Sequence, residues 1–169
     1  MSTDNLQQPP LWILSIHDQS PDGFLSFDLK DILLCLGPSI RDYSWLITEL
    51  DCVGEDTEGI CETVEKNKKK GLNISAEGLI EVSQRIRQTI DATIIGTRTK
   101  EDLESLRNGF RDLEHFPQDR TEVIIRAIDS SFFEVITKNP EHVHRLEECF
   151  KNIREENPKN YFPLNTTGI

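Results

Sequence analysis

Hydrophobic residues along the chain fall into short β-branched runs and into stripes with helical spacing. Runs rich in Ile, Val and aromatic residues, bounded by turn-forming residues, predict five strands. The predicted strands span residues 11–17, 43–53, 89–97, 122–128 and 132–137. The last two form the clearest pair, because Asp129-Ser130-Ser131 between them suits a tight hairpin turn.

Five further stretches carry apolar residues three and four positions apart, which is the spacing of an amphipathic helix. The predicted helices, each counted from its N-cap, span residues 28–36, 57–70, 75–88, 99–108 and 139–153. Their first residues are favourable caps, namely Asp28, Thr57, Ser75, Thr99 and Asn139. Gly37 and Pro38 stop the first helix, and Gly71 stops the second.

The order of these elements is β-α-β-α-α-β-α-β-β-α, without an internal repeat. This order predicts an α+β fold with a single mixed or mostly antiparallel five-stranded sheet and helices packed on one face. A chain of 169 residues can bury a real core as one domain. We therefore expect residues 1–169 to form a single globular domain, with residues 1–10 as a disordered tail and residues 155–169 as an irregular C-terminal tail.

Charge is distributed unevenly along the chain, whose formal net charge is −11 from 30 acidic and 19 basic residues. Residues 1–65 hold thirteen acids and two bases, whereas the rest of the chain holds seventeen of each. The densest run is residues 49–65, with seven acids and no base. This balance disfavours nucleic-acid binding, since neutralising phosphates requires an excess of Lys and Arg.

An acidic run of this kind favours a basic protein partner, although the alternative that it only keeps the domain soluble stays open. In a protein complex such acids would steer association and form the rim of the interface. The candidate partner-binding residues are Glu49, Asp51, Glu55, Asp56, Glu58 and Glu62.

We expect no segment that targets the chain to a membrane or out of the cell. Residues 1–10 are polar, and no apolar run approaches the ~18 residues that span a bilayer. We therefore expect a cytoplasmic protein that does not bind membranes. Its four cysteines form no CxxC pair and should be free thiols in a reducing compartment. Two of them, Cys35 and Cys149, are expected to be small core residues.

The common catalytic and cofactor-binding motifs are missing, including the phosphate loop, the dinucleotide fingerprint, the nucleophile elbow and the HExxH zinc motif. His142 and His144 lie two positions apart on a predicted helix, about 200° around its axis, and cannot share a zinc ion. We expect both at the surface. Residues 51–62 have the length of a calcium loop but place Val53 and Asp56 where that loop needs an oxygen ligand and a glycine. The sequence therefore predicts no metal and no cofactor.

Two catalytic hypotheses stay open on weaker grounds. His17 and Asp18 could form an acid/base pair at the end of the first strand, and Cys52 or Cys61 could be a nucleophile with a histidine from elsewhere. Carboxylates near these cysteines should raise the pKa of each thiol and weaken it as a nucleophile. We therefore do not expect an enzyme.

The C-terminal third resembles a known class of small proteins. The run Val123–Thr137 (VIIRAIDSSFFEVIT), followed by the capped helix NPEHVHRLEECFKNIREE, resembles small cytosolic bacterial immunity-type proteins of toxin/immunity systems. The resemblance implies a single α+β domain that blocks a toxin by binding it, and it carries over no catalytic residue.

The sequence thus leaves two main hypotheses for function. The first is a protein-binding domain that neutralises a cognate basic toxin. The second is a small enzyme or ligand-binding domain with a pocket near His17 and the strand ends, which would hold convergent polar groups and a shifted pKa. A third class, an accessory subunit with a permanent apolar interface, also stays open, and the oligomeric state is not predicted.

Overall fold

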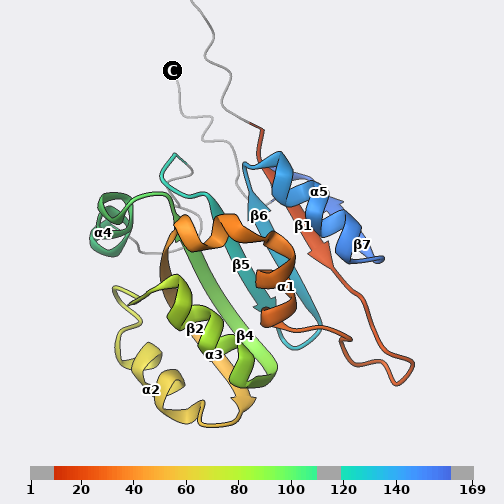
Figure 1. Ribbon diagram of the computed structural model, residues 1–169, viewed down its shortest axis with the longest axis horizontal. Coiled ribbons are helices and arrows are strands. Elements are labelled where there is room, and N and C mark those ends of the chain that lie inside the picture. Colours follow the sequence, from red (N-terminus) through yellow and green to blue (C-terminus); the bar gives the residue numbers. More distant parts are fainter. Residues whose placement is uncertain (1–9, 110–118, 161–169) are drawn as a thin grey trace, which may run out of the picture.

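The computed structural model describes residues 10–109 and 119–160, which form one antiparallel sheet with helices on both of its faces (Figure 1). The strands are β1 (Trp12–Ile16), β2 (Ser44–Gly54), β3 (Leu72–Ile74), β4 (Ile86–Thr97), β5 (Val123–Ile128), β6 (Phe132–Thr137) and β7 (Ile153–Glu156). Their order across the sheet is β3-β2-β4-β5-β6-β1-β7, and every neighbouring pair is antiparallel. The α+β class and the antiparallel sheet are confirmed.

The predicted number of strands is wrong, because the sheet has seven strands and not five. The two missing strands, β3 and β7, are its outermost strands. β3 is only three residues long, and β7 (IREE) is mostly polar and is separated from the end of α5 (Pro140–Cys149) by three residues. Short edge strands with few apolar residues leave little pattern in a sequence. Because β7 is a strand, the prediction of an irregular tail from residue 155 is also wrong for residues 155 and 156.

The helices are α1 (Leu29–Leu36), α2 (Glu58–Lys66), α3 (Ala76–Arg85), α4 (Lys100–Gly109) and α5 (Pro140–Cys149). Side-chain caps from Asp28, Ser75 and Asn139 are confirmed, each accepting a hydrogen bond from a backbone N–H in the first turn. The side chain of Thr57 makes no such cap. Four helices, α1, α2, α3 and α5, pack on one face of the sheet and share its main core. The largest buried side chain of this core is Trp45.

The expectation that all helices cover one face is wrong for α4. Leu103 and Leu106 of α4 join a second, smaller core on the opposite face of the sheet. That core includes the strand residues Ile95 and Ile124, which point away from the side occupied by Trp45 and the other helices. Successive side chains of a strand point to opposite faces of the sheet. Because β4 and β5 carry apolar side chains on both faces, both of their faces must be covered by other parts of the protein.

Several predictions fall partly or wholly on residues outside those described. The predicted N-terminal tail, residues 1–10, is described only at residue 10, and the predicted C-terminal tail only up to residue 160. Among the described residues, no helix is both long and apolar enough to cross a membrane.

Candidate functional site

The acidic segment, residues 49–65, occupies the second half of β2, the turn after it and α2. Glu49 and Asp51 lie on β2, Glu55 and Asp56 in the turn, and Glu58 with Glu62 on α2. All six predicted side chains are exposed to solvent. Within the described part of the chain, none of the six belongs to an ion pair. Their negative charges are therefore available to a positively charged partner.

The two acids of β2 point away from the sheet face that α1, α2, α3 and α5 cover. Glu49 lies opposite Thr93 of β4 and accepts a hydrogen bond of 3.2 Å from its hydroxyl. Asp51 lies opposite Asp91 in the same ladder. Because Ala92 and Ile94 of β4 face the main core, Thr93 and Asp91 must face the other side of the sheet, as do their partners on β2.

The pairing of Asp51 with Asp91 places a further acid, Asp91, beside the predicted acidic residues. Sequence reasoning missed this residue. Like charges directly opposite each other on neighbouring strands destabilise a sheet. The Asp91 carboxylate also accepts a hydrogen bond of 2.9 Å from the backbone N–H of Asp129. The alternation of apolar residues in 89–97 gives no sign of this pairing, because the register of β2 against β4 depends on three register shifts between Ile47 and Gly54.

The remaining acids surround the end of β2 and do not extend its open face. Val64 of α2 is buried in the main core, so α2 lies on the side of the sheet opposite to Glu49. Glu58 and Glu62 are four residues apart and share a face of this helix. The structure therefore divides the six predicted residues among one sheet face, one turn and one helix.

Two boundaries limit the acidic surface. At the end of α2, Glu65 forms an exposed ion pair of 2.6 Å with Lys68, which raises the pKa of that lysine. Lys68 belongs to a group of exposed lysines at this end of α2, which consists of Lys66, Lys68, Lys69 and Lys70. At the sheet edge, β3 pairs with β2 only from Trp45 to Ile47. Beyond that point no described strand covers the outer edge of β2.

Cys52 and Cys61 lie inside the acidic segment, with their sulfur atoms 3.4 Å apart. Burial, followed by the neighbouring Cys61 thiol, raises the pKa of Cys52 to about 12. The predicted direction of this shift is confirmed for Cys52, although burial contributes more than the carboxylate of Asp51. A thiol that ionises so reluctantly is a weak nucleophile at neutral pH.

His17 and Asp18 do not form the predicted acid/base pair. The carboxylate of Asp18 accepts hydrogen bonds from the backbone N–H groups of Lys151 and Asn152, and so ties the end of β1 to the start of β7. The ring of His17 stacks on Phe132, with 5.0 Å between ring centres. Its Nε2 lies 3.0 Å from the hydroxyl of Ser15. Burial, and secondly Arg154, lowers the pKa of His17.

The predicted surface position of His142 is wrong, whereas that of His144 is confirmed. His142 is completely buried, with Nδ1 2.8 Å from the hydroxyl of Thr137 and Nε2 3.2 Å from that of Ser39. His144 is exposed and pairs with Glu148 at 3.3 Å. In the described ranges no group of three His, Cys, Asp or Glu residues could hold a metal ion.

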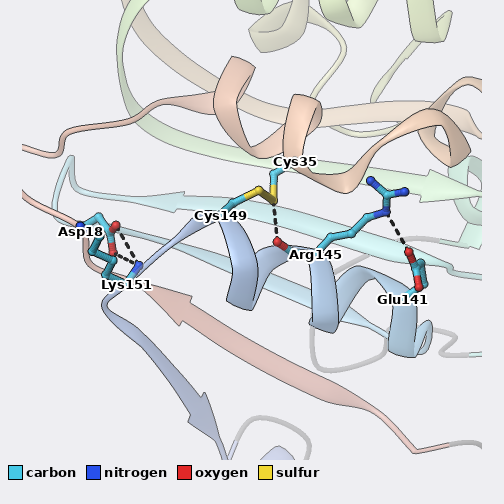
Figure 2. The surroundings of a disulfide bond; sticks show 6 residues. All are labelled: Asp18, Cys35, Glu141, Arg145, Cys149 and Lys151. Atoms are coloured by element: carbon cyan, nitrogen blue, oxygen red, sulfur yellow. Dashed lines mark hydrogen bonds and ion pairs between the residues drawn. A yellow bond between two sulfur atoms is a disulfide. The ribbon is translucent and has the colours of Figure 1, made fainter.

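The expectation of four free thiols is wrong for Cys35 and Cys149, which form a disulfide bond (Figure 2). Cys35 lies in the last turn of α1 and Cys149 is the last residue of α5. The two helices pack against each other, so residues 114 positions apart in the sequence meet. Sequence spacing alone could not show this contact. Cys35 is buried as expected, but Cys149 is exposed.

A hollow of about 570 Å³ lies between α1 and α3. Its apolar lining includes Leu33, Ile40 and Ile80, and it is bordered by Leu34, which is 81% exposed. Its charged lining consists of three cations and one acid, namely Lys30, Arg41, Arg145 and Asp31. The guanidinium of Arg145 packs on Gly37, where any Cβ would come within 2.8 Å of it. The hollow is thus apolar with a basic border, unlike the acidic segment.

A second hollow, of about 420 Å³, lies where β4 begins, between the residues leading into α1 and the turn joining β5 to β6. It is lined by Asp28, Arg87 and Thr89, but the Asp28 carboxylate already bonds the backbone N–H and the hydroxyl of Thr89. His17 lines neither hollow.

Comparison with protein-family models, with curated proteins and with solved structures gave no match for this chain.

Proposed function

We propose that this protein is a non-enzymatic binding domain whose acidic surface engages a basic protein. Following the resemblance of its C-terminal third, we propose an immunity-type protein that neutralises a cognate basic toxin domain by binding it. The acidic surface consists of Glu49, Asp51, Glu55, Asp56, Glu58 and Glu62, and we add Asp91 to it.

One observation carries the proposal. Six exposed carboxylates surround the second half of β2 and the start of α2, and the described residues give none of them a cation. Some exposed acids elsewhere do have such partners, for example Glu77 with Arg41 and Glu81 with Arg85. Keeping like charges together, including Asp51 opposite Asp91, works against folding and favours a role in association.

The acidic surface would act in two steps. Its field would first attract a basic partner and raise the association rate, an effect that falls as salt screens it. The exposed outer edge of β2 and the half-exposed side chain of Val53 would then offer backbone and apolar contacts beside the charges. A toxin held in this way would have its basic face covered and kept from its anionic target.

The surroundings of the candidate catalytic groups support the non-enzymatic part of the proposal. Asp18 accepts hydrogen bonds from two backbone N–H groups, His17 is held by Phe132 and Ser15, and burial raises the pKa of the Cys52 thiol to about 12. Each of these groups therefore has a structural explanation.

The experiment compares two variants with the same change in net charge. In the test variant E55Q/D56N/E58Q/E62Q, neutral side chains of similar size replace four acids of the acidic surface. Asn is used at residue 56 because its φ of 52° is one that Asn tolerates well. The control variant D42N/E101Q/E147Q/E155Q neutralises four exposed acids elsewhere on the protein.

Each tagged protein is used to capture partners from cells that express it naturally, and the captured partner is then purified and titrated. We expect a basic polypeptide that binds the wild type and the control, with an association rate that falls as salt rises. The test variant should bind it at least about tenfold more weakly, since four charges at an interface contribute several increments of up to about 1 kcal/mol each. Equal affinity of the test and control variants would contradict the acidic surface.

A second candidate function follows from the hollow beside α1. Leu34 is exposed on α1 next to an apolar hollow with a basic border, as expected for a permanent interface with another subunit. Light scattering of the wild type and of L34E tests this candidate. A dimer that L34E dissociates would favour it, and a monomer at all concentrations would count against a homodimer through this surface.

We also propose a cytoplasmic location, which has a consequence for the redox state of the Cys35–Cys149 pair. In a reducing compartment the glutathione and thioredoxin systems would keep Cys35 and Cys149 as thiols. Rapid alkylation of thiols in intact cells, followed by mass spectrometry, measures the state of this pair directly.

A further inference from the structure

Cys52 and Cys61 face each other between β2 and α2 in the acidic segment. Their sulfur atoms are 3.4 Å apart, and both side chains are partly exposed. A disulfide bond is about 2.0 Å long, so the two sulfurs need to approach by only about 1.4 Å. The helix is thus already placed for a covalent bond to the strand.

The fold arranges all four cysteines of the chain in two pairs. Four cysteines allow three ways of pairing. The packing of α1 on α5 unites Cys35 with Cys149, and the packing of α2 on β2 unites Cys52 with Cys61. One pair is bonded and the other is in sulfur–sulfur contact.

Few fully buried side chains hold α2 in place, so a covalent bond there would have a large effect. Of its nine residues, Val64 alone is fully buried. Thr57 provides no side-chain cap at its N-terminus. A helix with so few buried contacts opens more readily than the rest of a domain.

We propose that Cys52 and Cys61 are a modification site, at which a small disulfide such as oxidised glutathione generates a second protein disulfide that ties α2 to β2. This inference goes beyond the proposed function and does not depend on it.

The reaction is a double thiol–disulfide exchange. Cys61 loses its proton to solvent and attacks one sulfur of oxidised glutathione, which breaks the glutathione S–S bond and releases one glutathione thiolate. Cys52 then loses its proton and attacks the Cys61 sulfur, which releases the second glutathione thiolate. The protein pair gives up two protons and two electrons, and oxidised glutathione is reduced to two thiols. The roles of the two thiols can be exchanged without changing the balance of the reaction.

Oxidation would also fix part of the acidic surface. The new ring would enclose residues 52–61, and so hold Glu55, Asp56 and Glu58 in one arrangement. The reduced protein would present the same residues on a segment that opens more often.

The experiment treats the full chain with excess oxidised glutathione, alkylates the remaining thiols and digests the protein with a protease that cleaves after Glu. The four cysteines then lie on four different peptides, of which residues 50–55 carry Cys52 and residues 59–62 carry Cys61. We expect mass spectrometry to detect these two peptides joined. The variant C35S/C149S should give the same product, and C52S should not.

Amide hydrogen exchange in α2 gives a second test. If the two thiols only fill space in the fold, treatment with oxidised glutathione should leave the exchange rate unchanged. Closing a short ring should slow exchange in α2 by at least about tenfold in the oxidised wild type, but not in treated C52S. The proposal is overturned if both thiols remain alkylatable after treatment, if each carries glutathione, or if either joins Cys35 or Cys149 instead. Because no partner protein is used, these results are independent of the proposed binding function.

Discussion

The hydroxyl of Thr137, the last residue of β6, lies 2.8 Å from Nδ1 of His142 in the first turn of α5. Both side chains are buried. On the other side of the ring, Nε2 lies 3.2 Å from the hydroxyl of Ser39 and 3.4 Å from that of Tyr43. A single imidazole thus joins the end of β6 to the segment that precedes β2.

This arrangement makes folding sensitive to acid. Burial lowers the pKa of His142 to about 4, from 6.5, although Glu141 acts in the opposite direction. Well above pH 6.5 the ring is neutral in both the folded and the unfolded state, and its titration has no effect on stability. As the pH falls towards 4, the unfolded state takes up the proton first, so the free energy of unfolding should drop by about 1.4 kcal/mol per pH unit. Urea unfolding at several pH values between 7.5 and 4.5 measures the loss, about 3 kcal/mol in total.

The variant H142Q isolates this contribution. The variant keeps every other titratable group of the protein, including His17, whose pKa burial also lowers. The difference in slope between the wild type and H142Q therefore reports His142 alone. Parallel curves for the two proteins between pH 6.5 and 4.5 would show that His142 is protonated as easily when folded as when unfolded.

A second prediction concerns Asp18, which bonds the backbone N–H groups of Lys151 and Asn152 at 2.6–3.1 Å. D18A should lower the free energy of unfolding by about 1–2 kcal/mol, since hydrogen bonds to a charged group are the stronger ones. D18N keeps one acceptor oxygen and should lose less. Hydrogen exchange at Lys151 and Asn152 should speed up in D18A. Unchanged exchange at these two amides would contradict the role of Asp18 in holding this segment of backbone in place.

The sequence predicts the elements of this fold better than its long-range contacts. Asp28, Ser75 and Asn139 mark helix starts because each cap acts on N–H groups within a few residues of it. The hairpin of β5 and β6 follows from its turn for the same reason. The second core around Leu103, and the burial of His142, depend on contacts between distant segments that no local pattern encodes.

A third prediction concerns the cross-strand pair of Arg126 and Glu134, whose side chains bond at 3.0 Å. Glu134 is almost fully buried and Arg126 is 25% exposed. R126M would leave a buried carboxylate without its cation and should cost about 3 kcal/mol of stability, whereas R126M/E134M should recover most of that loss. Urea unfolding of the single and double variants completes the cycle. If R126M were as stable as the wild type, another group would have to neutralise Glu134.

For the candidate site, the sequence indicates which residues carry charge but not how they are arranged. The density of acids in residues 49–65 is visible directly, and all six predicted side chains are exposed. Their division between two sides of the sheet follows from the bulges of β2 and from the anchoring of α2 by Val64. The contribution of Asp91 depends on strand register, which sequence periodicity does not fix across a bulge.

The last prediction separates stability from association at Asp51. This side chain is exposed and lies directly opposite Asp91, so removing its charge relieves repulsion across the strands. D51N should therefore raise the free energy of unfolding by about 0.5 kcal/mol at low salt, and the gain should shrink as salt screens the pair. E101Q removes an exposed charge on α4 and serves as the matched control. If the acidic surface binds a basic partner, D51N should also slow association with that partner while E101Q does not. A less stable D51N would mean that Asp51 contributes to folding, and its exposed charge would then need no functional explanation.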